Sequence, residues 1–398
     1  MLLLAPAAAA PAFDPYPTLW SSNSIDPTAL EAAGIKQKRV RNWSCHDSPP
    51  SYCTRPVTTG GDGSNCIRGR WPLITKTGTI NGGVPQAANL TAHLEEVRRT
   101  LPLGVPENYT GLASIDFEDW APIWSEDTSH DAWHSQAYQN LSISLVQQAQ
   151  PSLSLAQATV IAQQQFEKAA LSWFVETVKL CRSLRPKARW GYYGFPQSFT
   201  FKGYSDPTRG PILRQKNDKL QPLWDAVDVL QPSIYLAQWG ASPPTLARMN
   251  AAQLNTTMDE SVRLQRQTPS RPEIWPYQYF YYNSGKQNVT LTPEDTTISI
   301  EYPYDHGATG LVLWGDPLYK NRTVPGTVAQ FQRYFADLLG PAVTAFKRKV
   351  DACAAQRCHG HGRCLLPLLD AIGAAADAAA GCECQPGYDP SADCKSPL

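Results

Sequence analysis

Short apolar runs that alternate with helical segments constrain the fold of this chain more than any other feature. Five such apolar or aromatic runs lie at 112–117, 189–194, 229–236, 274–280 and 310–314. The longest helical segment, 154–184, opens with Ser154, carries apolar residues at helical spacing and stops before Pro186. Strand–helix alternation repeated at least five times predicts an α/β fold with parallel strands, and a (β/α) barrel in particular.

Three further segments extend this pattern. Residues 18–22 and 38–43 are candidate early strands, and 217–230 is expected to form a helix closed by Pro232. Residues 13–345 are therefore expected to form the barrel.

The C-terminal part, 350–398, has a different composition. Six of the ten cysteines lie there: Cys353, Cys358, Cys364, Cys382, Cys384 and Cys394. Such a cluster predicts a small disulfide-stapled module, although spacing alone leaves 15 pairings open. His359 and His361 are interpreted as turn residues of this module, since a zinc site needs four well-placed ligands, and no metal is expected.

Several signals favour the secretory route and a secreted or luminal location. Seven Asn-x-Ser/Thr sequons are candidate glycosylation sites, at Asn42, Asn89, Asn108, Asn140, Asn255, Asn288 and Asn321. Residues 1–12 resemble the remnant of a signal peptide, and no run of about 18 apolar residues predicts a membrane span. Lys+Arg and Asp+Glu both number 35, which excludes a generally basic nucleic-acid binder.

Two carboxylates at the end of the run 112–117 form the most informative motif. Asp116 and Glu118 are two residues apart, so strand geometry directs both side chains to one side of the sheet. In a barrel that side is the interior, and the carboxyl ends of the strands are where barrel enzymes keep their active sites. Because two crowded carboxyls repel, one should keep its proton to higher pH, as a general acid on a glycosidic oxygen requires.

The spacing of this pair also indicates a mechanism. A usual retaining pair of carboxylates flanks the glycosidic bond across about 5 Å, whereas neighbours on one strand approach from the same side. The acetamido oxygen of an N-acetylated sugar can supply the missing nucleophile. Asp116 would then orient the acetamido group, while Glu118 protonates the leaving oxygen and later activates water. Two solvated acids at a strand end remain the alternative for this motif taken alone.

Six segments in sequence order carry a resemblance to a known family. They are 81–86 (Asn-Gly-Gly-Val-Pro-Gln), 115–120 (Ile-Asp-Phe-Glu-Asp-Trp), 190–196 (Trp-Gly-Tyr-Tyr-Gly-Phe-Pro), 217–220 (Asn-Asp-Lys-Leu), 232–235 (Pro-Ser-Ile-Tyr) and 310–314 (Gly-Leu-Val-Leu-Trp). Together they resemble the hyaluronidase family, the endo-β-N-acetylhexosaminidases of the animal and venom type, over about residues 78–340. The cysteine-rich tail resembles an EGF-like module, which many members carry.

The resemblance implies a distorted TIM-like barrel that hydrolyses β-1,4 bonds after N-acetylhexosamine in hyaluronan or chondroitin, with retention and without a cofactor. It assigns the acid/base role to Glu118 and the acetamido-positioning role to Asp116. Tyr193 and Tyr235 match tyrosines that hydrogen-bond the reacting sugar, and Trp314 matches the aromatic that closes the acetamido pocket. For the EGF-like module it implies pairing of the first cysteine with the third, the second with the fourth and the fifth with the sixth.

The remaining aromatic residues and Cys181 receive separate interpretations. Tyr192 is expected to face the helices and belong to the core, because successive side chains of a strand alternate. Tyr277 and Tyr279 are lesser candidates for sugar contact. Cys181 is interpreted as a buried thiol rather than a nucleophile.

The chain also departs from the family pattern. The cysteine expected after the Tyr-Gly-Phe-Pro segment is replaced near Gln197 and Ser198, whereas Cys45, Cys53 and Cys66 lie close together. Thr257 occupies the place of an arginine associated with the anionic sugar, which raises the prospect of an unusual substrate. A chitinase-like hydrolase of uncharged polymers and a non-catalytic adhesion protein, with a protein partner at the EGF-like module, are the alternatives.

Overall fold

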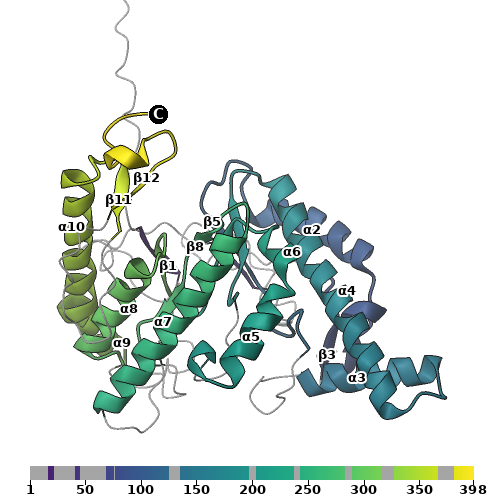
Figure 1. Ribbon diagram of the computed structural model, residues 1–398. Helices are drawn as coiled ribbons and strands as arrows, with labels where there is room; N and C mark the ends of the chain where they lie inside the picture. The colour runs from purple at the N-terminus through teal and green to yellow at the C-terminus, as the bar shows by residue number, and fades with distance from the viewer. Residues whose placement is uncertain are drawn as a thin grey trace, which may run out of the picture.

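In the computed structural model the described residues are 17–21, 41–44, 69–75, 77–124, 135–196, 203–236, 243–282, 289–314, 327–365 and 381–398. Several sequence predictions lie outside them: residues 1–12, Cys45, Cys53, Cys66, Asn288 and Asn321. Figure 1 shows helices arranged around short central strands, with the C-terminal segment in yellow beside α10 (Gly340–Gln356).

Eight short strands form one continuous series of parallel neighbours, in which β8 and β9 are consecutive segments that occupy one position. They are β1 (Thr18–Ser21), β2 (Arg41–Ser44), β5 (Leu112–Asp116), β6 (Arg189–Tyr192), β7 (Val229–Leu230), β8 (Glu273–Ile274), β9 (Tyr277–Tyr279) and β10 (Leu311–Trp314). The sheets β2–β5–β6, β7–β8 and β1–β10–β9 are joined by parallel bridges from Tyr193 to Gln231 and from Ser233 to Tyr277. The predicted α/β class with parallel strands is confirmed. Within the described residues, no pairing joins β1 to β2.

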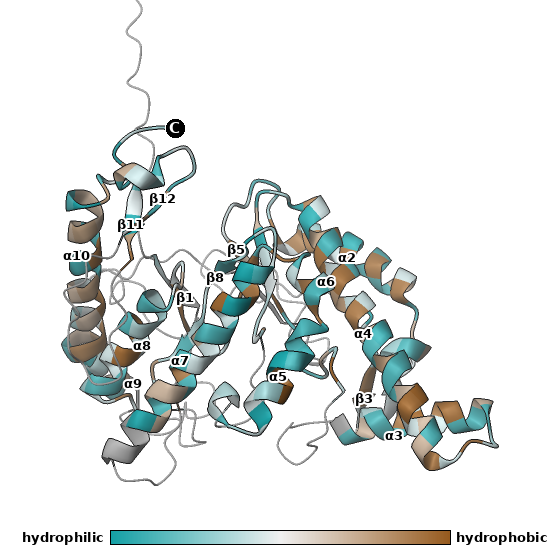
Figure 2. Cartoon of the chain, viewed as in Figure 1, coloured by the Kyte–Doolittle hydropathy of each residue, from teal (hydrophilic) through white to brown (hydrophobic). Residues whose placement is uncertain are grey.

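Helices follow the strands as the alternation predicts. They are α2 (Leu90–Gly104), α3 (Ser135–Ala149), α4 (Leu155–Leu184), α5 (Arg209–Asp218), α6 (Gln221–Trp224), α7 (Pro243–Gln267), α8 (Pro293–Asp305), α9 (Thr327–Tyr334) and α10, with a π-helical segment, Phe335–Leu339, between the last two. Figure 2 shows hydrophobic and hydrophilic residues intermixed along these helices. Ser154 caps α4 in a capping box with Gln157, close to the predicted start.

The predicted helix 217–230 is wrong. Helix α5 ends at Asp218, α6 lasts only four residues, and Val229–Leu230 form strand β7. Pro222 explains the break, because a residue without an amide hydrogen fits the first turn of a new helix but not the interior of a longer one. The backbone amide of Asp228 donates to the Trp190 carbonyl oxygen at 2.8 Å, so the chain is already paired with β6 at this point.

Two apolar clusters lie on opposite faces of the strands. The larger one lies between the strands and the helices, and includes Ile115, Trp190 and Leu313. The smaller one contains Leu112, Val229, Tyr235, Trp275, Tyr277 and Val312. We call the strand face that carries this smaller cluster the inner face. Since both faces are buried, the strands are apolar almost throughout, as parallel strands usually are.

Two antiparallel hairpins complete the described structure. The first pairs β3 (Leu73–Thr75) with β4 (Gly78–Ile80). The second, in the C-terminal module, pairs β11 (Gly362–Cys364) with β12 (Cys382–Cys384). Short 3-10 turns occupy Pro85–Ala87, Gly203–Ser205 and Pro390–Ala392.

Three disulfides staple the C-terminal module. They join Cys353 to Cys364, Cys358 to Cys382 and Cys384 to Cys394, which is the pairing that the EGF-like resemblance implies. Helix α10 runs without a break across residues 345–350, so it continues from the α/β body into the cysteine-rich segment.

None of the helices described has a stretch both long and apolar enough for a membrane span. Nowhere in the described ranges do three His, Cys, Asp or Glu side chains gather as metal ligands would.

Candidate active site

The predicted site residues come from different strands and meet on the inner face at the carboxyl ends of the strands. Asp116 is the last residue of β5, and Trp314 the last of β10. Tyr193 follows β6 directly, and Tyr235 lies two residues beyond the bridge that Ser233 makes with Tyr277. Because all neighbouring strands are parallel, their carboxyl ends lie at one edge, which is where ligands bind in α/β folds.

The two carboxylates differ in exposure. Glu118 is exposed and Asp116 is half-buried, whereas Phe117 between them is buried on the other face and stacks on Trp71 with ring centroids 4.0 Å apart. The Nε1 of Trp120 donates to the Pro72 carbonyl oxygen at 2.8 Å and fixes the chain just after the motif. This alternation gives one solvent-facing carboxyl and one that is partly withdrawn from water.

Two tyrosines lie beside the carboxylates. The hydroxyl of Tyr193 donates to that of Tyr235 at 2.9 Å. Burial raises the pKa of Tyr193 well above its usual value, and the negative charges of Glu118 and Asp116 raise it further. Burial likewise raises the pKa of Tyr235, with smaller contributions from neighbouring tyrosines. Both phenols therefore remain protonated hydrogen-bond donors throughout the pH range in which the carboxyls titrate.

An aromatic wall borders these groups. The rings of Tyr235 and Tyr279 stack with centroids 3.6 Å apart, and the Trp314 ring lies 4.9 Å from that of Tyr279. Tyr279 is only partly buried, so it is available to a ligand, whereas Tyr277 is 1% exposed and belongs to the interior packing. Tyr192 is buried on the helical side, where its hydroxyl donates to the Phe174 carbonyl oxygen at 2.9 Å, as predicted.

Sequence reasoning missed Ser233, whose side chain hydrogen-bonds Tyr193. The signal was present, because Ser233 and Tyr235 are two residues apart and so share a face of the same extended segment. No pattern in the sequence, however, shows which side chain on the neighbouring strand they meet.

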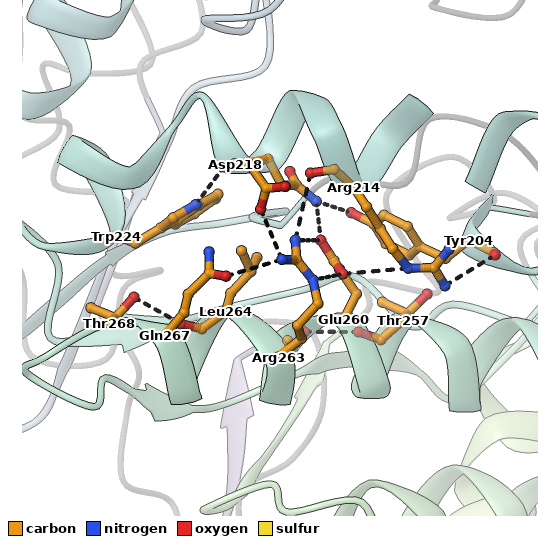
Figure 3. A network of polar contacts seen from close by, with 12 residues as sticks. Tyr204, Arg214, Asp218, Trp224, Thr257, Glu260, Arg263, Leu264, Gln267 and Thr268 are labelled. Atoms are coloured by element: carbon orange, nitrogen blue, oxygen red, sulfur yellow. Dashed lines mark hydrogen bonds and ion pairs between the residues drawn. The ribbon is translucent and has the colours of Figure 1, made fainter. Parts of the chain in front are cut away.

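Thr257 does not lie at the site. Its side chain is 1% exposed on α7, next to a polar network centred on the buried Glu260 (Figure 3). Arg263 Nε donates to Glu260 Oε2 at 2.7 Å, and Asn217 Nδ2 donates to Glu260 Oε1 at 2.8 Å. The threonine is thus buried and does not replace the charge of the arginine that the family pattern has at this position.

The other candidate residues are placed as follows. Among the sequons, Asn89, Asn108 and Asn140 are exposed and Asn255 is half-buried. Asn42 is the second residue of β2. Cys181 is fully buried on α4, as predicted, which prevents it from acting as a solvent-facing nucleophile.

A parallel α/β fold with a carboxylate pair and tyrosine hydroxyls at the carboxyl ends of its strands is an arrangement that glycoside hydrolases of the barrel class use. Comparison with known proteins gives the family. The model of the hyaluronidase family of glycoside hydrolases matches residues 67–368. The chain belongs to this family.

Individual relatives agree with this assignment. A hyaluronidase from Conus consors is 32% identical over 76% of this chain and 64% of its own length. Hyaluronidase-1 from Sus scrofa is 32% identical over 76% of this chain and 70% of its own. A chondroitin hydrolase from Caenorhabditis elegans is 32% identical over 72% of this chain and 61% of its own. The chain thus spans about two thirds of the length of these relatives.

Solved structures of bee venom hyaluronidase are similar in fold. One has 26% sequence identity and a TM-score of 0.65, and covers 82% of this chain and 99% of its own. A second, in complex with a hyaluronic acid tetramer, has a TM-score of 0.66.

Proposed function

We propose that this protein is an endo-acting hydrolase of hyaluronan or chondroitin, built on a TIM-like barrel, that cleaves β-1,4 bonds after N-acetylhexosamine with retention. The observation that carries the proposal is the placement of Asp116 and Glu118 beside the Tyr193 hydroxyl, whose pKa both carboxylates raise. The bee venom complex and the named relatives support a glycosaminoglycan as the substrate class.

In the first step, Glu118 donates its proton to the glycosidic oxygen as the bond from that oxygen to C1 breaks. The acetamido carbonyl oxygen of the same sugar forms a bond to C1 from the opposite face and gives a cyclic oxazolinium ion. The half-buried Asp116 stabilises the positive charge that develops on the acetamido nitrogen. In the second step, the Glu118 carboxylate takes a proton from a water molecule, which attacks C1 and reopens the ring.

The tyrosines and the tryptophan position the reacting sugar. Tyr193 and Tyr235 hydrogen-bond the sugar and its acetamido group, and the Tyr193 proton becomes available for this when its bond to Tyr235 opens. The wall formed by Tyr279 and Trp314 offers apolar faces to the acetamido methyl group and the sugar ring. The acetamido group must be held against C1 for the reaction, so these contacts act on the rate as well as on binding.

The three disulfides support a secreted or luminal location, since such bonds persist in oxidising compartments. The exposed Asn89, Asn108 and Asn140 are the sequons best placed to carry glycans there. We also propose that the EGF-like module, 350–398, binds a protein partner.

The substitution Glu118→Gln tests the function. It removes the proton donor and preserves the shape, so kcat should fall by roughly 10²–10⁴-fold while binding of hyaluronan oligosaccharides is retained. Glu107→Gln, at an exposed glutamate after α2, is the matched control and should retain full activity. Reducing ends released from hyaluronan, chondroitin and chitin oligosaccharides should be measured in parallel.

Each other outcome would indicate a different function. Comparable activity of Glu118→Gln would contradict the acid/base assignment. Preferential cleavage of chitin oligosaccharides would identify a chitinase-like enzyme, and binding without any cleavage by the unmodified protein would identify a glycan-binding adhesion protein.

A further inference from the structure

Two polar side chains are enclosed on the inner face below the candidate active site. Ser114 on β5 and Gln231 after β7 are both 0% exposed. The hydroxyl of Ser114 and both carboxamide atoms of Gln231 have no hydrogen-bond partner among the described residues. A buried polar group left without a partner costs about 1–3 kcal/mol, so native proteins normally satisfy such groups, often with ordered water.

Strand register places these two side chains on either side of one glycine. Ser114 is the register partner of Gly191 in β6, and Gln231 is bridged to Tyr193, two residues further along the same strand. A Cβ atom on Gly191 would lie 3.3 Å from Gln231 Oε1 and 2.3 Å from the Val229 carbonyl oxygen. The Gln231 carboxamide therefore packs against the backbone of Gly191, which is the register partner of Ser114. A side chain larger than that of glycine at position 191 would collide with Gln231 and Val229.

Ser114 and Gly191, beside which Gln231 lies, precede Asp116 and Tyr193 by two residues along their strands. Asp116 follows Ser114 by two residues on the same face, and Tyr193 follows Gly191 in the same way, a rise of about 7 Å. Asp116 and Glu118 act on the same neighbours, because the negative charges of both raise the pKa of the Tyr193 and Tyr279 phenols. Since Glu118 disfavours a second negative charge, polar groups beneath Asp116 are a means of keeping it ionised.

We propose that Ser114 and Gln231 bind one or two ordered water molecules on the inner face, and that this hydrated layer extends to Asp116 and holds its carboxyl in the charged form. The three polar atoms provide both donors and acceptors, which is the set that a buried water molecule requires. Ser114 and Gln231 are thus positioning residues. Their effect on Asp116 rests on the proposed function, whereas the water site itself does not.

A high-resolution crystal structure of the full chain tests the water site. It should show density for water within about 3.2 Å of Ser114 Oγ and of the Gln231 carboxamide. In Gln231→Leu that density should be lost. A direct hydrogen bond between Ser114 and Gln231 with no water between them would overturn the inference.

The pH dependence of kcat/KM tests the positioning role. The low-pH side of the kcat/KM profile, its acid limb, should move to higher pH by on the order of 0.5 unit in Gln231→Leu. At a pH below this limb, kcat/KM should therefore fall roughly threefold. Ser114→Ala removes a single atom and should shift the limb in the same direction even if the leucine variant folds poorly. The double variant should shift the acid limb no further than Gln231→Leu alone, since both residues act through the same hydrated layer.

Gln278→Leu is the matched control. Gln278 is 0% exposed and its Nε2 donates to the Tyr279 carbonyl oxygen at 2.8 Å, but it lies on the opposite face of β9 from Tyr277 and Tyr279. Its substitution should lower stability and leave the acid limb in place. An unmoved limb in both Ser114→Ala and Gln231→Leu would refute the positioning role. If the unmodified protein hydrolyses no glycan, the proposed function fails, and the crystallographic test still decides the water site.

Discussion

His93 shows how one buried side chain can set the acid stability of the molecule. The imidazole is 0% exposed, its ring centroid lies 4.6 Å from that of Trp71 and 4.5 Å from that of Trp173, and its Nε2 is 3.0 Å from the Thr177 hydroxyl oxygen. Burial lowers the pKa of His93 from 6.5 to about 3. The folded protein thus holds the neutral form, while the unfolded chain binds a proton below about pH 6.5.

The contribution of His93 to stability is therefore fully present above pH 6.5 and is lost as the pH falls from 6.5 towards 3. The loss should reach on the order of 5 kcal/mol at pH 3. His93→Gln should flatten the dependence of the unfolding free energy on pH over this range, measured by denaturant titration. His359→Asn, at an exposed histidine, is the control. An equally steep dependence in His93→Gln would rule out this histidine as the acid-sensitive group.

At the scale of residues, the sequence was informative wherever local geometry decides. The two-residue spacing of Asp116 and Glu118 predicted a shared side, and their burial pattern around Phe117 agrees. The pairing of Ser114 with Gly191, and the approach of Gln231 to Gly191, could not be predicted, because both depend on the register between strands that are distant in sequence.

At the scale of elements, α4 was predictable because its start signal and its apolar periodicity coincide. Ser154 accepts from the Gln157 backbone amide, and Gln157 Oε1 accepts in turn from the Ser154 amide. Prolines account for the elements that were predicted less well. Pro222 separates α5 from α6, and Pro276 divides the predicted strand 274–280 into β8 and β9.

Ser154→Ala removes the side-chain half of this cap and should lower the free energy of unfolding by about 1 kcal/mol without changing kcat. Ser172→Ala, at an exposed position inside α4, should be neutral or slightly stabilising, since alanine has the higher helix propensity. Thermal and denaturant unfolding of both variants measures the difference. Equal stabilities of the two would mean that the cap does not contribute.

At the scale of the whole molecule, the C-terminal module is anchored to the α/β body by specific contacts. The Tyr304 hydroxyl on α8 donates to the Cys364 carbonyl oxygen at 2.7 Å. The guanidinium of Arg363 donates to the carbonyl oxygens of Ala308 and Gly307 and lies over the Tyr304 ring. The cysteine pattern predicted the module but not this attachment, because the residues that Arg363 and Cys364 contact lie on α8 and in the turn after it, far from the cysteines in sequence.

Arg363→Ala should therefore lower the melting temperature of the full chain and leave kcat unchanged, because the contacts lie away from the carboxyl ends of the strands. Deleting 350–398 should destabilise the protein more severely, since it also removes Val350 and Ala354, which are buried on α10. Calorimetry and initial rates on both variants check this. A truncated protein with unchanged melting temperature would show that the module does not brace the body.

The central claim is that hydrolysis proceeds by two successive displacements at C1, the first by the acetamido group of the substrate after Glu118 protonates the leaving oxygen, and not by direct attack of water. Proton NMR of the reducing ends released in the first moments of hyaluronan hydrolysis, before mutarotation, tests it most directly. Two successive displacements at C1 should give the β-anomer first. Initial release of the α-anomer would contradict the account, since it would mean a single displacement by water.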